Sequence, residues 1–372
     1  MNTTLLLVSL CLLLLPALAV ADPLLTHTDV FTSGTDGYHT FRIPTLEVAP
    51  DGTLLAFAEA RKHNASDPGY SNNDIDLVLK RSTDAGRTWS KMIVVHNPGQ
   101  FWSAANAATI VDRSNGRIWL LYICSKPGRS TRTSRPGSDD MQLLARTSDD
   151  NGATWSGPID LSRVAKDYDD PKWRASVVGP GGAIQDSKGR LVAPMWKVEP
   201  VGAFAIFSAD HGKTWERGQL VPGLAGNEDQ IVELADGRLL MDVRQTSGAH
   251  RWLTTSTDGG RTWSKPRSGE AVTACACAIE RFALKSAGGD RDRIIWTGPK
   301  GPARKTLVVR VSTDEGKTFA HERLLSPDLA AYSDLAMLKD NTAGVLWERA
   351  SYKFITFTRF NREFLDAAPA PQ

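Results

Sequence analysis

One eight-residue motif occurs five times along this chain of 372 residues. Each copy reads Ser-x-Asp-x-Gly-x-Thr and ends on Trp, or on Phe in the last copy. The copies begin at Ser82, Ser148, Ser208, Ser256 and Ser312. A motif that recurs at separations of about 50 to 65 residues predicts a repeat architecture, in which each copy belongs to one structural unit.

The motif itself predicts a tight hairpin turn. Its Ser and Asp side chains can hydrogen-bond the backbone of the turn, and its Gly accepts a positive φ. We expect the final Thr-Trp pair to begin a strand, with the aromatic ring as an anchor. The motif is therefore predicted to be structural, and its spacing favours one four-stranded antiparallel sheet per repeat over a helical solenoid.

A second pattern, a turn followed by an apolar strand, sets the number of units. It occurs at Asp51-Gly52, Asn115-Gly116, Lys188-Gly189 and Asp236-Gly237, and in weaker form after Asp292 and Asp340. Six units of roughly 55 to 60 residues use nearly all of the chain. We therefore predict an all-β fold, a single six-bladed β-propeller of four-stranded antiparallel sheets over residues 22–372. The sixth unit lacks the eight-residue motif, as expected if the chain ends close the ring there.

The composition fits such a fold and argues against nucleic acid as a partner. Apolar residues make up 41% of the chain, which is enough to bury a large core. The formal net charge is only +2, and Lys and Arg are interspersed with acidic residues. No run of basic residues is available to bind a phosphate backbone.

The first 21 residues are predicted to be a signal peptide. Residues 5–15 are almost all apolar, and Ala19-Val20-Ala21 is a small-x-small cleavage site before Asp22. The segment lacks the usual Lys or Arg near its start, but its apolar run is too short to span a bilayer comfortably. We therefore expect a secreted or periplasmic protein with no stable membrane span after cleavage.

Three cysteines remain after such a cleavage: Cys124, Cys275 and Cys277. Their number is odd, and a Cys-x-Cys pair without a second pair of ligands is a poor zinc motif. Buried or free thiols are expected, and no metal or cofactor is predicted.

A further motif, Phe41-Arg42-Ile43-Pro44, places one charged side chain among apolar neighbours. Taken alone, Arg42 is also consistent with an arginine at the edge of the core that pairs with an acid. Together with the five repeats, however, the motif resembles the signature of the bacterial-type sialidase (neuraminidase) family, in which the repeats are called Asp-boxes or BNR repeats. The resemblance runs from about Phe41 to Glu348.

The resemblance implies a clamp of three arginines. The family's substrate, a terminal sialic acid, carries a carboxylate on its anomeric carbon, and the planar arginine side chain pairs with a carboxylate through two parallel hydrogen bonds. Arg42 and Arg244 match the first two clamp positions. Arg304 resembles the third, and Arg310 is the alternative, although it falls inside the strand that leads into the fifth motif.

The resemblance also implies an unusual nucleophile. An Asp or Glu would be repelled by the substrate carboxylate, whereas a neutral phenol would not, and sialidases use a Tyr. Tyr332 matches that position; otherwise it is a tyrosine that anchors a strand. A phenol is a weak nucleophile until a base removes its proton. Glu228 matches the family's base, and Glu233 is the nearest alternative.

The same family pattern includes an acid/base residue for the leaving group and for water. Asp67 matches its loop position, while Asp74 and Asp76 are alternatives that fit better at the start of a strand. Glu348 matches the acid that orients Arg42. Arg61 resembles a further pocket arginine, or it forms a surface ion pair with the neighbouring Glu59.

Two aromatic residues, and one stretch in which the sequence differs from the family pattern, bear on the walls of the pocket. Trp102 and Trp196 are candidates to line it, although an aromatic residue in a propeller more often fills space between strands. The family tends to read Asn-Pro before Val-Val-Asp in the second unit, where this chain has Asn106-Ala-Ala-Thr-Ile-Val-Asp112. That side of the pocket is expected to have a different shape.

Together these positions imply an exo-α-sialidase that retains anomeric configuration through a tyrosyl-enzyme intermediate. Its partners would be sialylated glycans of glycoproteins, glycolipids or oligosaccharides, and a monomer is expected. The alternatives are a hydrolase of the related sugar Kdn, a trans-sialidase, or a propeller that binds sialoglycans without catalysis. Linkage preference cannot be predicted from these residues.

Overall fold

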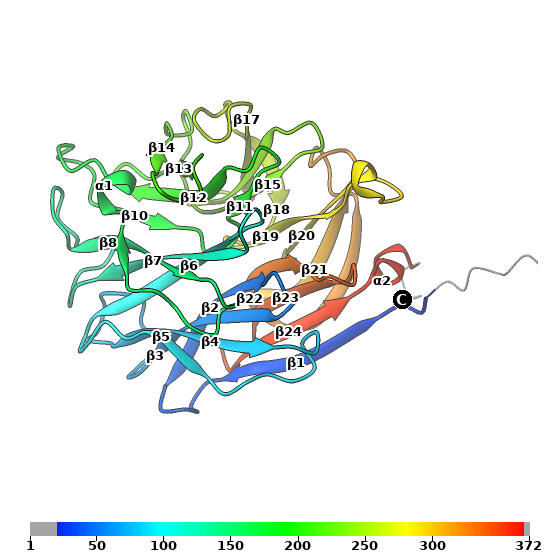
Figure 1. The fold of residues 1–372 in the computed structure, drawn as a ribbon, viewed down its shortest axis with the longest axis horizontal. Coiled ribbons are helices and arrows are strands. Elements are labelled where there is room, and N and C mark those ends of the chain that lie inside the picture. Colours follow the sequence, from blue (N-terminus) through cyan, green and yellow to red (C-terminus); the bar gives the residue numbers. More distant parts are fainter. Residues whose placement is uncertain (1–20, 368–372) are drawn as a thin grey trace, which may run out of the picture.

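The computed structural model describes residues 21–367, and nearly all of its regular structure is β-strand (Figure 1). The all-β prediction is confirmed. Apart from Ala21, the predicted signal peptide at residues 1–21 lies outside the described residues. The helical elements are short: α1 (Ser162–Ala165), the 3-10 turn η1 (Lys285–Ala287) and α2 (Arg362–Asp366).

The structure has 24 strands within the described residues. The first nine are β1 (Leu25–Thr32), β2 (Thr40–Val48), β3 (Leu54–Arg61), β4 (Ile75–Ser82), β5 (Ile93–His96), β6 (Ser103–Asp112), β7 (Arg117–Ser125), β8 (Met141–Ser148) and β9 (Ile159–Asp160). The next nine are β10 (Ala175–Val178), β11 (Ile184–Gln185), β12 (Leu191–Val198), β13 (Gly202–Ser208), β14 (Glu216–Arg217), β15 (Gly226–Glu233), β16 (Leu239–Gln245), β17 (His250–Ser256) and β18 (Arg267–Ala271). The last six are β19 (Ala278–Ala283), β20 (Arg293–Pro299), β21 (Lys305–Ser312), β22 (His321–Met337), β23 (Ala343–Arg349) and β24 (Phe354–Phe360).

The strands form groups, and within each group the neighbouring strands pair antiparallel. One group runs from β2 to β5, the next from β6 to β9, a third from β10 to β14 and a fourth from β15 to β18. In the third group β10 and β11 both pair with β12, so the two short strands together count as its first strand. The turns between the first and second strands of these groups contain the predicted Gly52, Gly116, Gly189 and Gly237, all with positive φ. The long strand β22 then serves two groups, because its first part pairs with β21 and its second part with β23.

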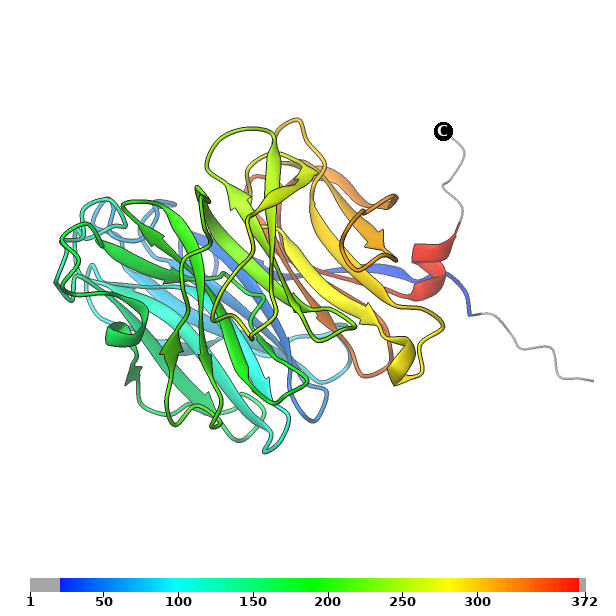
Figure 2. The ribbon, with the colours of Figure 1, turned by 90° about the horizontal axis from the view of Figure 1, so that it is seen from above.

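The two ends of the described chain meet in one sheet. β1 pairs antiparallel with β24, from Leu25 opposite Phe360 to Thr32 opposite Phe354. In Figure 1 the colours progress around the molecule until blue β1 lies beside red β24. Figure 2 shows the sheets standing side by side, with the green strands towards one end of the molecule and the yellow and orange strands towards the other.

The repeated motif forms the same turn in all five copies, as predicted. In the first copy the Ser82 hydroxyl donates to Asp84 (2.8 Å) and accepts from the N–H of Gly86 (2.9 Å). Asp84 accepts from both the N–H (2.9 Å) and the hydroxyl (2.6 Å) of Thr88. The other four copies repeat these bonds. The expected strand begins later than predicted, since Trp89 precedes β5.

Trp89 lies outside the strand because the motif's aromatic residue packs against a neighbouring sheet. The ring of Trp155 meets Phe57 of β3 edge-on, with ring centroids 5.7 Å apart. In the first motif Trp89 meets Phe357 of β24 in the same way, at 5.5 Å. A Cβ added at Gly86 would lie 2.0 Å from the Phe357 ring, so this approach requires glycine. In these two copies the motif therefore fastens its own sheet to a neighbouring one, the second sheet to the first and the first sheet to the last.

Buried polar groups tie the innermost strands together. The side-chain amide of Gln230 on β15 donates to the carbonyl of Pro180 (3.0 Å) and to Asp334 on β22 (2.9 Å), and its oxygen accepts from the N–H of Ile279 on β19 (3.1 Å). Asp334 also accepts from the N–H of Leu46 on β2 (2.8 Å). Strands that are distant in sequence are thus linked by buried hydrogen bonds, which are costly to leave unmade.

A cavity of about 660 Å³, here called the central cavity, lies between innermost strands. Its lining comes from β2, β6, β11, β15, β19 and β22. Burial, together with the nearby charges of Glu47 and Asp334, raises the pKa of Glu280 in its wall to about 8. Burial also raises the pKa of Glu47 and of Asp334 to about 7.

The cysteines and the two tryptophans are part of the core. Cys124, Cys275 and Cys277 are buried and free, as expected. Trp196 is buried among Ala105, Ile123 and Val177, and Trp102 packs against another core cluster, so both fill space between strands. Within residues 21–367, no helix is long and apolar enough to cross a membrane.

Candidate active site

Three predicted site residues lie at β-bulges in innermost strands. One extra residue interrupts the pairing of β2 between Arg42 and Thr45, that of β15 between Gly226 and Asp229, and that of β22 between Ala330 and Ser333. Arg42 stands at the first bulge, Glu228 in the second and Tyr332 in the third. Bulges redirect side chains. Pro44 suits the first one because proline has no N–H to contribute to the ladder.

Tyr332 and Glu228 form a close hydrogen-bonded pair. The Tyr332 hydroxyl lies 2.6 Å from Oε1 and 2.8 Å from Oε2 of Glu228. Arg244, at the end of β16, donates from Nη1 to the phenol oxygen (2.7 Å) and also bonds Glu228. Burial and the charge of Glu228 hold the pKa of Tyr332 well above its usual value. The phenol is therefore neutral, and its proton points at a carboxylate.

Three guanidinium groups surround the Tyr332 ring. Their central carbons lie 5.6 Å (Arg42), 5.9 Å (Arg244) and 5.3 Å (Arg304) from the ring centroid. Arg310, the alternative to Arg304, lies elsewhere: it pairs with Glu322 (2.9 Å) on the neighbouring part of β22. It is Arg304 that the structure brings to Tyr332.

Glu348 on β23 joins Arg42 to the backbone of Tyr332. Its carboxylate accepts from Nε (2.5 Å) and Nη2 (3.3 Å) of Arg42. It also accepts from the N–H of Ile43 (2.9 Å) and of Tyr332 (3.1 Å). The Glu348 side chain is fully buried. Glu348 thus lies where its predicted role of orienting Arg42 requires.

Asp67 lies on the loop between β3 and β4, and its side chain is 68% exposed. Arg61 donates to it from Nη1 (2.9 Å) and to Glu59 from Nε (3.1 Å) and Nη2 (2.7 Å). The ion pair between Arg61 and Glu59 is not at the surface, because both side chains are only 1% exposed. Among described residues, Arg61 is the one predicted site residue that Asp67 contacts.

The alternative carboxylates have other partners. Asp76 lies on β4, as the strand pattern predicted, and accepts from the Tyr38 hydroxyl (2.6 Å). Asp74 accepts from the N–H of Phe101 (2.5 Å). Glu233 lies at the other end of β15 from Glu228, beside the central cavity, and accepts from the N–H of Ser187 (2.8 Å).

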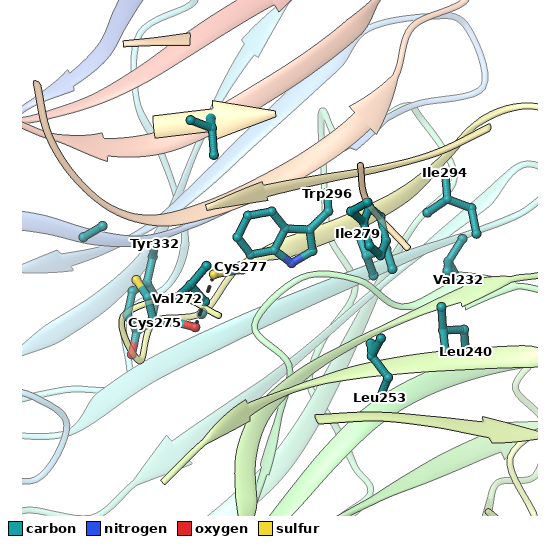
Figure 3. Close-up of a cluster of buried hydrophobic side chains, with 14 of the residues drawn as sticks. Val232, Leu240, Leu253, Val272, Cys275, Cys277, Ile279, Ile294, Trp296 and Tyr332 are labelled. Carbon is teal, nitrogen blue, oxygen red and sulfur yellow. Dashed lines mark hydrogen bonds between the residues drawn. The ribbon is translucent and has the colours of Figure 1, made fainter. Parts of the chain in front are cut away.

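Two residues beside Tyr332 were not predicted as part of the site. Cys275 belongs to the same buried cluster, and Figure 3 shows it next to Tyr332 at one end, with Leu240 and Leu253 at the other. The Cys277 thiol lies 3.5 Å from the carbonyl of Cys275. Tyr352, in the turn between β23 and β24, contacts both Arg42 and Arg304. Cys275 stands in a Cys-x-Cys pair, which predicts no place beside a tyrosine, and Tyr352 stands in no recognisable motif.

The described residues provide no evident metal site. Within the part of the chain that the structure describes, no group of three or more His, Cys, Asp or Glu side chains is arranged to hold a metal ion. The site is built instead from arginines, carboxylates and a phenol, a set suited to binding an anion and transferring protons.

Known proteins share this sequence and fold. Residues 52–345 match the family model for the BNR repeat-like domain. The chain is 32% identical to a sialidase of Micromonospora viridifaciens over 94% of its length, but it spans only 56% of that protein. It is 31% identical to a sialidase of Clostridium perfringens, over 70% of each chain. The solved structure of the Hadza microbial sialidase Hz136 is similar with a TM-score of 0.81 and 26% identity, over 90% of this chain and 68% of that one.

Proposed function

Because this chain belongs to the bacterial-type sialidase family with BNR repeats, we propose that it is an exo-α-sialidase that removes terminal α-linked sialic acids from glycoconjugates. One observation carries the proposal: three arginines surround a buried tyrosine whose hydroxyl donates to Glu228. A cluster of three cations attracts a carboxylate, and sialic acid carries one on the carbon that must react. The natural substrates would be sialylated glycans of glycoproteins, glycolipids or oligosaccharides.

Binding is assigned to Arg42, Arg244 and Arg304, which hold the substrate carboxylate. Arg61 is a further pocket residue, whose buried ion pair with Glu59 keeps it extended toward Asp67. Arginine stays charged at any working pH, so the clamp does not titrate.

In the first chemical step the phenol oxygen of Tyr332 attacks the anomeric carbon. Glu228 takes the phenol proton, and the hydrogen bond from Arg244 stabilises the oxygen as it loses that proton. Asp67 gives its proton to the glycosidic oxygen, and the aglycone leaves as an alcohol. The product is a sugar joined to Tyr332.

In the second step Asp67, now ionised, takes a proton from water while the water oxygen attacks the anomeric carbon. The bond to Tyr332 breaks, and Glu228 returns its proton to the phenol oxygen. Two displacements at one carbon restore the original configuration, so the enzyme retains it. The exposure of Asp67 is compatible with this role, because both the aglycone and the water must reach it.

We further propose that the fold is a six-bladed β-propeller. Its support is the succession of four-stranded antiparallel groups, the closing of the last group by β1, and a central cavity lined by one strand of each group. Residues 22–372 would form one catalytic domain and residues 1–21 a cleaved signal peptide. The protein would be secreted or periplasmic and act as a monomer.

The activity is tested with the 4-methylumbelliferyl α-glycoside of N-acetylneuraminic acid. The purified protein should release the fluorophore, and Tyr332→Phe should lower kcat by several orders of magnitude, because the substitution removes the proposed attacking oxygen. Tyr168→Phe is the matched control, since it removes a hydroxyl that also donates to a carboxylate, Asp139 (2.7 Å), outside the proposed site.

The outcomes separate the alternative functions. Turnover in Tyr168→Phe and not in Tyr332→Phe supports the proposed mechanism. Near-normal turnover in Tyr332→Phe would remove Tyr332 from it. The folded wild-type protein could instead cleave only the Kdn glycoside, transfer the sugar to an added acceptor, or bind sialoglycans without cleaving them. Each of these results would replace the proposed hydrolysis of N-acetylneuraminic acid by the function observed.

A further inference from the structure

Tyr352 joins two of the three arginines around Tyr332. Its ring lies under the Arg42 guanidinium, whose central carbon is 3.9 Å from the ring centroid. Its hydroxyl oxygen lies 3.2 Å from Nη1 of Arg304. We propose that Tyr352 is a positioning residue that orients Arg42 and Arg304 to receive the substrate carboxylate, an inference that rests on the proposed sialidase function.

Arg304 needs such a partner more than the other two arginines do. Arg42 is paired with Glu348 and Arg244 with Glu228. For Arg304, no ion pair is present among residues 21–367; its partners are the Tyr352 hydroxyl and the carbonyl of Ala274 (3.3 Å). Both partners are neutral. They can fix the guanidinium without cancelling its charge, so the full charge remains available to a bound anion.

The contact with Arg42 follows the same principle. Glu348 occupies Nε and Nη2 of Arg42, while the Tyr352 ring covers the face of the guanidinium plane. A cation over an aromatic face is attracted by the ring without losing hydrogen-bond donors. Edge contacts from Glu348 and a face contact from Tyr352 together restrict rotation of the Arg42 side chain.

The turn that carries Tyr352 has an unusual backbone. Ala350, Ser351 and Tyr352 all have positive φ, at 51°, 53° and 70°. Left-handed conformations are unfavourable for residues other than glycine, and runs of them are found where the surrounding structure imposes them. Tyr352 is thus presented by a turn that the local sequence would not adopt by itself.

Hydrogen bonds from both sides hold this turn. The N–H of Ala350 donates to the carbonyl of Leu329 on β22 (2.9 Å). The Ser33 hydroxyl donates to the carbonyl of Tyr352 (2.7 Å), and the N–H of Ser33 donates to the carbonyl of Lys353 (2.9 Å). The turn also borders a cavity of about 230 Å³ that Tyr352 shares with Arg304 and Glu348.

The test measures inhibition by 2-deoxy-2,3-didehydro-N-acetylneuraminic acid, which keeps the carboxylate, and by its methyl ester, which does not. Tyr352→Phe keeps the ring over Arg42 but removes the hydroxyl that holds Arg304. We expect it to weaken inhibition by the acid about fivefold and to raise KM similarly. Inhibition by the ester and the thermal midpoint should stay as in the wild type. Tyr352→Leu, which also removes the ring, should weaken inhibition by the acid further.

A double-mutant cycle with Arg304→Ala shows whether the effect passes through Arg304. In that background Tyr352→Phe should have no additional effect on inhibition by the acid. Three results would each overturn the inference. Tyr352→Phe could weaken inhibition as much in the Arg304→Ala background as in the wild type, it could weaken inhibition by the acid and by the ester equally, or both Tyr352 variants could leave inhibition by the acid unchanged. If instead the folded wild type neither cleaves sialosides nor binds the acid, it is the proposed function that fails.

Discussion

At the scale of single residues, the site places opposite charges around one neutral group. Tyr332 stays protonated because it is buried beside Glu228, which raises its pKa. Arg244 contacts both members of the pair. A phenol with a raised pKa is a poor nucleophile at rest, but the same contacts stabilise the oxygen once the proton moves to Glu228. A neutral resting state would also avoid repulsion of the proposed anionic substrate.

The choice between Arg304 and Arg310 can be tested at this scale. Arg304→Ala should raise KM and the inhibition constant of the unsaturated acid by roughly 10- to 100-fold, because it removes one charged partner of the carboxylate. Arg310→Ala should leave both nearly unchanged and affect stability instead, because Arg310 binds Glu322 and Glu270. Steady-state kinetics of both variants decide between the two arginines. A larger rise in KM and in the inhibition constant for Arg310→Ala than for Arg304→Ala would reverse the assignment.

The site residues that the sequence predicted were those that stand in family motifs. Arg42, in Phe-Arg-Ile-Pro, and Tyr332, which matches the position of the family's nucleophile, meet in the structure. Tyr352 could not be predicted, because Ala350-Ser351-Tyr352 carries no glycine or proline to announce a left-handed turn. Its contacts depend on strands that are far apart in the chain, and spacing along a sequence does not determine such contacts.

At the scale of elements, the bulged strands aim side chains and the repeated turns hold the sheets. Bulges in β2, β15 and β22 accompany Arg42, Glu228 and Tyr332, whereas the repeated turns lie between the third and fourth strands of their groups. In the proposed function, catalysis and stability therefore rest on different elements, and mutations should separate them.

Asp258 of the fourth motif provides that test. It accepts from the hydroxyl of Ser256 (2.8 Å) and from the N–H (2.9 Å) and hydroxyl (2.6 Å) of Thr262. Asp258→Ala should lower the free energy of unfolding by about 1 to 3 kcal/mol, since these donors lose their acceptor. Turnover per folded molecule should not change. Urea unfolding and kinetics check both points, with the exposed Asp169→Ala as a control. Lost turnover at unchanged stability would contradict the structural role.

At the scale of the whole molecule, the division of the chain into antiparallel sheets was largely predictable. The way in which strands are shared between sheets, and the short strands at their edges, were not. The repeats indicated antiparallel four-stranded units, and the chain has them. Nothing in the sequence indicated that β22 would run for 17 residues through two groups. The two-residue strands β9 and β14 were equally hidden, because so short a segment has no periodicity to recognise.

The central cavity predicts how stability depends on pH. Glu280 has a folded-state pKa of about 8, against an ordinary 4.5, because burial disfavours its charge. The contribution of Glu280 to the free energy of unfolding is therefore fully present below about pH 4.5, and it is lost as the pH rises through about 8. Thermal melts from pH 5.5 to 8.5 should show stability falling with pH, and Glu280→Gln should reduce the fall by roughly 3 kcal/mol. Identical pH profiles for the two proteins would contradict this assignment.

The tyrosyl-enzyme intermediate is tested most directly by trapping it. A 2,3-difluoro analogue of sialic acid should form a covalent bond to the enzyme, and this bond should be hydrolysed only slowly. The reason is that fluorine beside the anomeric carbon destabilises the positive charge that develops there. After digestion, mass spectrometry should find the sugar on the peptide that contains Tyr332, and Tyr332→Phe should carry no label. A label on Asp67 or Glu228, or inactivation without a label on Tyr332, would contradict the mechanism.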